Sequence, residues 1–185
     1  MYENGIKGVD FVVCNTDSQA LEASPVPVKI QLGATITEGL GAGSNPEVGR
    51  EAAIESSDKI TELLDANTKM LFLTAGMGGG TGTGAAPIIA EVAREKGILT
   101  VGVVTIPFST EGGFRKRYAE EGISELKKFV DTLLVINNEK LIEVYGDLTF
   151  TNAFAKANEV LNTATKGIAE VISQHLLVNI DLNDA

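Results

Sequence analysis

Residues 76–84, with the sequence Gly-Met-Gly-Gly-Gly-Thr-Gly-Thr-Gly, carry six glycines in nine positions. An apolar run at residues 70–73 precedes them, and a helical pattern at residues 88–93 follows. Glycine lets a ligand approach the main chain closely, and a helix N-terminus directs backbone N–H groups and a positive dipole end at an anion. A strand, a glycine loop and a helix in this order predict a phosphate-binding loop.

A second glycine loop, residues 39–45, also leads into a predicted helix, with Asn45 as its N-cap and Pro46 in its first turn. Polar turns at residues 15–17 and 107–111 follow predicted strands. Ligands of parallel sheets bind at the carboxyl ends of the strands, so the four loops are expected to gather at one edge. We therefore expect one site built from four loops.

The elements that must position these loops are strands alternating with helices. Strands are predicted at residues 9–14, 28–32, 70–75, 99–106 and 132–136. Helices are predicted at residues 18–22, 46–66 with a break near 56–57, 88–96, 114–129, 138–144 and 151–177, and the first residues as the tail of another helix. The last helix carries one apolar stripe. The predicted fold is α/β and Rossmann-like, with a mostly parallel sheet flanked by helices and a long helix at the C-terminal end.

The composition limits the possible classes of protein. The 185 residues suffice for one domain with a sizeable core, and 44% are apolar. A formal net charge of −10 disfavours sequence-independent binding to nucleic acid or to an anionic membrane. Cys14 is the single cysteine, which excludes an internal disulfide, and no apolar run approaches the length of a membrane span. These features predict a soluble, cytoplasmic protein.

Two nucleotide-binding motifs can be compared with the glycine loop. The P-loop pattern, with its phosphate-binding lysine, does not occur. The stretch Gly80-x-Gly82-x-x-Ala85 matches the loose dinucleotide fingerprint, although that fingerprint normally follows the first strand of its domain. A dinucleotide-dependent oxidoreductase is therefore the alternative from another class, without a visible hydride-transfer constellation.

The glycine loop with the following Ala85-Ala86-Pro87 resembles the signature of the tubulin/FtsZ superfamily. Further stretches resemble the family's other motifs in the family's order: Asn15-Thr16-Asp17, Gly39-Leu40-Gly41-Ala42-Gly43, Pro107-Phe108-x-x-Glu111-Gly112, Asn138-x-Lys140-Leu141 and Asn179-x-Asp181-x-x-Asp184. The resemblance covers essentially the whole chain and is to the bacterial FtsZ branch rather than to eukaryotic tubulin. It implies a GTPase that binds GTP or GDP with Mg²⁺. It also implies head-to-tail polymerisation at the mid-cell division ring, and contacts with division-ring and membrane-tether proteins through other regions.

The resemblance assigns the phosphate contacts to the two glycine loops. The α- and β-phosphates would be bound by Gly78, Gly79, Gly80, Thr81, Gly82, Thr83 and Gly84, through backbone N–H groups and the two hydroxyls. The γ-phosphate would be enclosed by Gly41, Ala42 and Gly43, which otherwise form a surface loop. Asp17 would approach Mg²⁺ through water, although by sequence alone it could equally be a turn residue or a helix cap.

The ribose and the base would be bound by side chains from other segments. Glu111 is suited to accepting hydrogen bonds from ribose hydroxyls, and Arg115, four residues on, either offsets phosphate charge or is a solvated helix residue. Phe154 and Asn158 share a helix face, so a phenyl ring could stack on a purine while an amide bonds its edge. Asn138 would meet the base from another side. Ordinary core packing is the competing interpretation for Phe154.

The last motif has a different implied role. In the family, this segment completes the site of the neighbouring subunit, so Asn179, Asp181 and Asp184 would act on that subunit's GTP. Hydrolysis would then depend on assembly. Without the family, the same acidic end is a solvated tail, and the nearby His175 serves the helix dipole.

Compared with the family, the chain is expected to begin inside the first helix and to end after the assembly motif. Residues 1–185 would then be a GTP-binding domain without the family's first strand, first glycine loop and second domain. That strand is expected at the centre of the sheet, and its loss would leave backbone groups unpaired. We therefore expect weak GTP binding and no turnover from this stretch alone. The alternatives are a non-hydrolysing nucleotide-binding module and a part of a longer functional chain.

Overall fold

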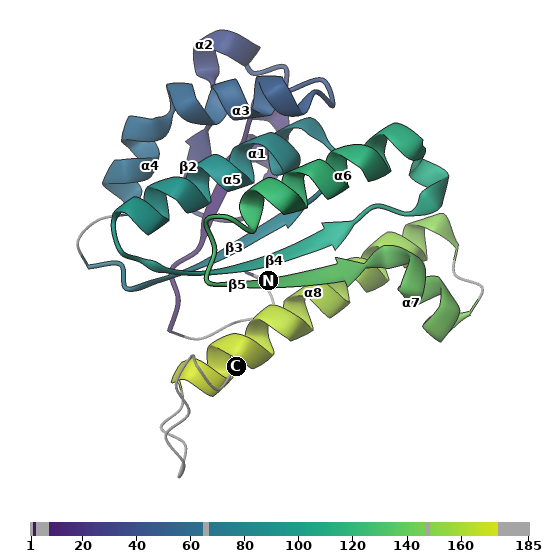
Figure 1. Cartoon of the computed structure of the whole chain (residues 1–185). Helices are drawn as coiled ribbons and strands as arrows, with labels where there is room; N and C mark the ends of the chain where they lie inside the picture. The colour runs from purple at the N-terminus through teal and green to yellow at the C-terminus, as the bar shows by residue number, and fades with distance from the viewer. Residues whose placement is uncertain (1, 3–7, 65–66, 147–148, 174–185) are drawn as a thin grey trace.

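The computed structural model of the chain describes residues 2, 8–64, 67–146 and 149–173 (Figure 1). The strands are β1 (Val12–Asn15), β2 (Val28–Gln31), β3 (Met70–Gly76), β4 (Leu99–Ile106) and β5 (Thr132–Asn137). The helices are α1 (Ser18–Ala23), α2 (Ala34–Thr37), α3 (Pro46–Glu55), α4 (Ser57–Leu63), α5 (Gly80–Glu95), α6 (Gly113–Leu126), α7 (Asn138–Tyr145) and α8 (Phe150–Ser173), with a 3₁₀ turn, η1, at Ser109–Glu111. The predicted α/β fold is confirmed.

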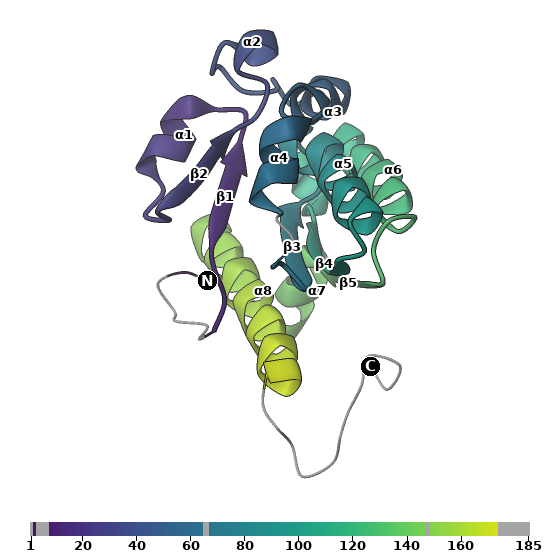
Figure 2. The ribbon, with the colours of Figure 1, turned by 90° about the vertical axis from the view of Figure 1, so that its left-hand side faces the viewer.

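All strand pairing between the named strands is parallel, but the strands form two sheets rather than one. β3, β4 and β5 are neighbours in that order, with Leu73 opposite Gly102 and Val103 opposite Leu134. β1 and β2 pair only with each other, and no ladder among the described residues joins β1 to β3. Figure 2 shows the two groups of strands side by side. The edge of β1 away from β2 and the edge of β3 away from β4 therefore lack a ladder partner in the described part of the chain.

Helices cover both faces of the three-stranded sheet (Figure 1). On one face, Leu73 and Val104 pack in a cluster with residues of α5 and α6. On the other face, Val101 and Val103 pack against the apolar stripe of α8. Because β4 has helices on both sides, Val101, Val103 and Val104 are fully buried, which explains why its sequence is a continuous apolar run.

The two-stranded sheet is held to the rest of the domain by a helical layer. Ile30 and Leu32, at the end of β2, share a buried cluster with Ala52, Ile60 and Ile88, which come from α3, α4 and α5. Leu32 and Ala52 are fully buried. This packing keeps the loop that follows β1 beside the loop that follows β3, although no strand ladder connects them.

Local capping signals give the helix boundaries that the sequence predicts. The Asn45 side chain accepts from the Glu47 N–H, and Pro46 occupies the first turn of α3, as predicted. The expected break near residues 56–57 is also present, since α3 ends at Glu55 and α4 begins at Ser57. The buried Ser56 hydroxyl between them accepts from the Gly33 N–H at 2.9 Å. α2 is an addition that the sequence analysis missed. Its first N–H groups are bound by the carboxylate of Glu55, which lies in a different helix.

One boundary differs from the expectation, because α5 begins inside the glycine loop. Gly80 is already helical, whereas the loop was expected to continue to residue 84. A Cβ at Gly84 would collide with the carbonyl oxygen of Pro46 and with the backbone of Arg50, both in α3. Glycine is therefore required there by the close crossing of two helices rather than by an unusual backbone angle.

α8 crosses the domain beneath the three-stranded sheet (Figure 1). Leu161, Ala164 and Ile168 face the sheet, which confirms the predicted stripe over the described residues. The predicted continuation to residue 177 falls beyond residue 173, outside the described part. Among the described residues, no helix combines the length and apolar character that a bilayer-spanning helix requires.

Candidate functional site

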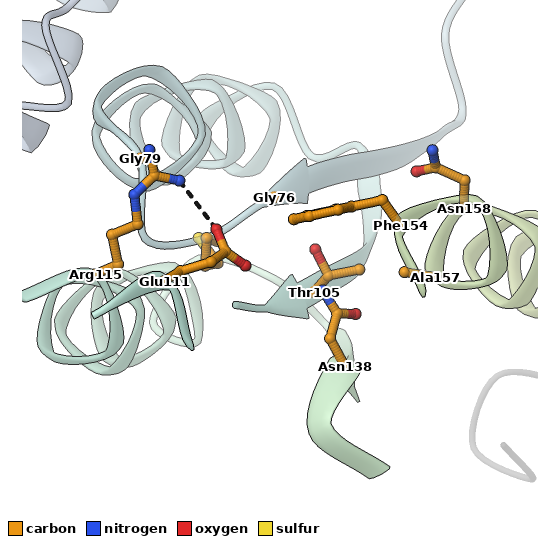
Figure 3. A pocket seen from close by; sticks show the side chains of 10 residues that line it. Gly76, Gly79, Thr105, Glu111, Arg115, Asn138, Phe154, Ala157 and Asn158 are labelled. Carbon is orange, nitrogen blue, oxygen red and sulfur yellow. Dashed lines mark hydrogen bonds and ion pairs between the residues drawn. The ribbon is translucent and has the colours of Figure 1, made fainter. Parts of the chain in front are cut away.

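A pocket of about 280 Å³ lies at the carboxyl ends of β3, β4 and β5 (Figure 3). It is lined by Gly76, Met77, Gly79, Thr105, Glu111, Arg115, Asn138, Phe154, Ala157 and Asn158. The glycine loop forms one end, and α8 forms the other. Of the four loops predicted to gather at one sheet edge, those at residues 76–84 and 107–111 line this pocket.

At the loop end of the pocket, the turn between β3 and α5 is stabilised by a side chain of its own helix. The Thr83 hydroxyl accepts from the Gly78 N–H at 2.8 Å, and Gly78 has a φ of +98°. Both the positive φ and the nearby Arg115 carbonyl exclude a side chain at Gly78. Thr83 is buried and does not line the pocket, so its visible contact is with the loop. Direct contact with phosphate by Thr83 stays a prediction.

Thr81 is bonded to a residue that the sequence analysis did not assign to the site. The hydroxyls of Thr16 and Thr81 are 2.6 Å apart, and Thr16 is fully buried. This bond joins the turn after β1 to the first turn of α5, across the gap between the two sheets. Thr16 belongs to the polar turn at residues 15–17 that was expected at the site, but no local pattern indicates its pairing with Thr81, 65 residues away.

The second glycine loop lies against the same helix start but does not line the pocket. Leu40 forms an isolated antiparallel bridge with Asp17, and a Cβ at Gly80 would lie 2.7 Å from the Cβ of the buried Ala42. The loop containing Gly41, Ala42 and Gly43 therefore adjoins the beginning of α5 and the end of β1. Its predicted contact with a γ-phosphate is not tested by this geometry.

Asp17 is a helix cap, one of the alternatives open from the sequence. Its Oδ1 accepts from the Ala20 N–H at 2.9 Å at the start of α1. Its Cβ and its Oδ2 lie 3.6 Å and 3.9 Å from the place of a Cβ on Gly41, so Asp17 is next to the second glycine loop. Asp17 thus caps α1 with one carboxylate oxygen and lies beside this loop.

Glu111 and Arg115 form an ion pair at the side of the pocket (Figure 3). The Arg115 Nη1 lies 3.0 Å from the Glu111 Oε2, and the Glu111 side chain is only 12% exposed. The other carboxylate oxygen accepts from the Phe108 N–H at 2.9 Å. A carboxylate has about four acceptor sites, so Glu111 keeps capacity for a ligand hydroxyl.

The opposite end of the pocket is formed by side chains from three elements. Phe154 and Asn158 lie on the same side of α8, as their spacing predicts, and Asn138 approaches from the start of α7 (Figure 3). The Phe154 ring packs edge to face on Phe108, with centroids 5.2 Å apart. The Asn138 side chain is buried, and its Oδ1 accepts no hydrogen bond from the described residues. A buried acceptor of this kind is expected to meet a donor.

Six of the predicted site residues therefore line one pocket: Gly79, Glu111, Arg115, Asn138, Phe154 and Asn158. The other four lining residues are Gly76, Met77, Thr105 and Ala157, which were not predicted as individual contacts, although Gly76 and Met77 belong to the predicted loop at residues 76–84. The position of Thr105 near the end of β4 was the available signal for it, and Ala157 comes from α8 beside Phe154 and Asn158. Asn179, Asp181, Asp184 and His175 lie outside the described residues. No group of three or more acidic, histidine or cysteine side chains suited to a metal occurs among the described residues.

The fold and the pocket define a class, that of parallel α/β domains with a ligand site at the carboxyl edge of the sheet. A family model narrows this class: the GTPase domain of the Tubulin/FtsZ family matches residues 1–146. The chain belongs to the Tubulin/FtsZ family. This membership favours the GTPase class over the dinucleotide oxidoreductases.

Individual relatives agree with this assignment. The chain is 54% identical to a cell division protein FtsZ of Porphyromonas gingivalis and 57% identical to that of Coxiella burnetii, in both cases over all 185 residues. It spans only 40% and 48% of the lengths of these two relatives. Among solved structures, an empty FtsZ dimer of M. jannaschii superposes with a TM-score of 0.93 at 46% identity, covering 99% of this chain and 53% of that one.

Proposed function

We propose that the pocket binds a guanine nucleotide and that the chain is the GTP-binding part of an assembling GTPase of the bacterial division ring. The observation that carries this proposal is the order of chemical groups along the pocket. Backbone at the glycine loop suits phosphates, the Glu111 and Arg115 pair suits a ribose with its phosphates, and Phe154 with two asparagines suits a purine. A nucleotide presents the same groups in the same order.

Asn138 gives this proposal its base specificity. Guanine presents donors at ring N1 and at the N2 amino group, where adenine has an acceptor and a C–H, so the unpaired Asn138 oxygen would favour guanine when it lies opposite these two positions. Asn158, at the same end of the pocket, supplies both a donor and an acceptor. A site that leaves a buried acceptor unpaired with the wrong base discriminates strongly against it.

Titration of the chain with GTP, GDP, ADP and NADH by calorimetry or ligand-observed NMR tests the proposal. We expect binding of both guanine nucleotides, with ADP at least about tenfold weaker because adenine lacks the N1–H and N2–H₂ donors proposed to pair with the Asn138 oxygen. Equal binding of ADP and GDP would contradict the base assignment. Preferential binding of NADH would instead support a dinucleotide site.

The family implies Mg²⁺ with the nucleotide, and Asp17 is the residue that would hold it. A carboxylate next to the second glycine loop suits a hydrated Mg²⁺, which keeps several waters and binds through one or two carboxylates plus phosphates. The cation would supply charge neutralisation to the phosphates. Asp17 would orient its water shell while still capping α1.

Hydrolysis is proposed to occur where subunits meet. Support comes from the relatives, which are named cell division proteins, and from the dimer named in the M. jannaschii structure. Asn179, Asp181 and Asp184 are the proposed catalytic residues for the neighbouring subunit's GTP. Mixing Asp181→Ala and Asp184→Ala longer chains into an assembly should lower GTP hydrolysis while leaving nucleotide binding intact. Loss of nucleotide binding in the same variants would contradict a borrowed site.

We also propose that residues 1–185 bind GTP weakly and do not turn it over by themselves. The support is the division of the strands into two sheets, since a further strand between β1 and β3 would pair both edges and fix the loops beside them. Light scattering with GTP measures assembly of the 185-residue chain directly. Nucleotide-dependent polymerisation by this chain would contradict the proposal.

A further inference from the structure

The 3₁₀ turn η1 carries Glu111, the proposed ribose-contacting residue, yet most of its hydrogen bonds are internal. The Phe108 N–H donates to the Glu111 carboxylate, and the Glu111 N–H donates back to the Phe108 carbonyl at 3.0 Å. The Gly112 N–H donates to the Ser109 carbonyl at 3.2 Å. These bonds keep the shape of the turn but do not fix where it lies in the domain.

The carboxylate of Glu139 connects this turn to another part of the domain. Its Oε2 accepts from the Ser109 N–H at 2.8 Å, across thirty residues of sequence. Glu139 lies in the first turn of α7, whose N-terminus is capped by Asn137, and this helix continues directly from β5. The bond therefore ties the turn that carries Glu111 to the rigid end of a sheet strand.

The electrostatics agree with a charged acceptor at this place. The hydrogen bond from the Ser109 N–H, assisted by the charge of Lys116, holds the pKa of the Glu139 carboxyl below its usual value. The carboxylate is therefore ionised at neutral pH, and ionised acceptors form the stronger hydrogen bonds. Glu143, one turn further along α7, instead forms an exposed ion pair with Lys140.

We propose that Glu139 is a positioning residue of the nucleotide site, which sets the ribose-contacting Glu111 at a fixed distance from the base-contacting Asn138. Asn138 and Glu139 are consecutive at the start of α7, one directed into the pocket and the other bonded to η1. A shift of α7 therefore moves both the base contact and the support of the ribose contact. This inference rests on the proposed binding of a guanine nucleotide.

The experiment compares the affinities of four proteins for two ligands. The proteins are the wild-type chain, Glu139→Ala, Glu139→Gln and the control Glu143→Ala, and the ligands are GDP and 2′,3′-dideoxy-GDP. We expect Glu139→Ala to lower the affinity for GDP about threefold to tenfold, because one charge-assisted hydrogen bond is lost. The dideoxy ligand offers no hydroxyl to Glu111, so its affinity should change by less than about twofold. Glu139→Gln keeps a neutral acceptor and should restore part of the affinity for GDP.

Hydrogen exchange at the Ser109 amide without ligand gives an independent readout. Exchange should be faster in Glu139→Ala than in the wild-type chain or in Glu143→Ala. Equal weakening of GDP and the dideoxy ligand would show a general loss of pocket structure and would overturn the positioning role. Unchanged GDP affinity in Glu139→Ala, with normal binding by the wild-type chain, would overturn this inference alone. Absence of GDP binding to the wild-type chain would overturn the proposed function and, with it, this inference.

Discussion

The two ends of the pocket are built from different parts of the chain. At the end formed by the glycine loop, backbone at Gly76 and Gly79 lines the pocket, and the position of this loop depends on helices that approach too closely for a Cβ at Gly84. At the opposite end, the walls are side chains of α7 and α8, among them Asn138 and Phe154. The glycine-loop end therefore depends on residues without side chains, and the opposite end depends on particular side chains.

This difference has a consequence for substitution. A side chain added at the backbone-built end pushes two helices apart, so the cost falls on the fold as well as on the ligand. A side chain removed from the other end takes away one contact and leaves α8 packed on the sheet through Leu161 and Ile168. Stability and affinity should therefore respond separately at the two ends.

Gly84→Ala should have the largest effect. The added methyl group collides with the Pro46 carbonyl and the backbone of α3, so we expect the free energy of unfolding to fall by about 3 kcal/mol. Urea denaturation measures it. The matched control is Gly167→Ala in α8. There an added Cβ meets no atom within 4 Å outside the helix's own backbone, so alanine should stabilise the helix by up to about 1 kcal/mol. If Gly84→Ala changed the affinity for GDP without lowering the free energy of unfolding, the expected difference between the two ends of the pocket would be contradicted.

Phe154→Ala should affect affinity more than stability. If the ring stacks on the base as proposed, its loss should lower the affinity for GDP about tenfold or more. Loss of the edge-to-face contact with Phe108 should lower the free energy of unfolding by about 1 kcal/mol. Calorimetry and urea denaturation measure the two effects, with Phe114→Ala, an exposed ring, as control. If GDP binds Phe154→Ala as tightly as the wild-type chain, the ring is core packing and not part of the site.

Thr16→Val tests the link between the two sheets. It removes the partner of the Thr81 hydroxyl. We expect the free energy of unfolding to fall by about 1 kcal/mol and the affinity for GDP to fall about fivefold. Thr100→Val is the control, because this equally buried hydroxyl bonds only the Ile98 carbonyl, away from the pocket. The control should lose similar stability and keep its affinity. Loss of affinity in both variants would show that any destabilisation weakens binding.

The smallest expected effect depends on pH and concerns Glu55. The backbone N–H groups of Thr35 and Ile36 hold the pKa of this carboxyl below its usual 4.5. A lowered pKa means that the stabilisation is present above the unfolded-state pKa and is lost as the pH falls through the folded-state pKa. Glu55→Gln should therefore be slightly less stable than the wild-type chain at pH 7, and this difference should shrink as the pH is lowered toward 3.

Urea denaturation at the two pH values measures this difference. Glu51→Gln, exposed on the same helix, is the control and should show the same small difference at both pH values. A Glu55→Gln difference that persists at pH 3 would exclude the carboxylate cap as its cause.

Much of the fold could be predicted because its signals are local. Asn45 and Pro46 begin α3, and an apolar stripe with a period of three and four gives α8 its buried face. The pairing of Glu111 with Arg115 also follows from a spacing of four residues. Such signals depend on interactions within one or two turns of the chain, so they are present before any tertiary contact forms.

The rest was decided only by the tertiary structure. The start of α5 at Gly80 depends on how closely α3 crosses it, and the partner of Thr81 lies 65 residues away at Thr16. The bond from Ser109 to Glu139 likewise exists only because parallel strands bring their carboxyl ends to one edge. The sequence by itself determined the family, the alternation of strands and helices and the glycine loop. Contacts between distant segments decide which side chains hold that loop and the 3₁₀ turn η1, and no local pattern encodes those contacts.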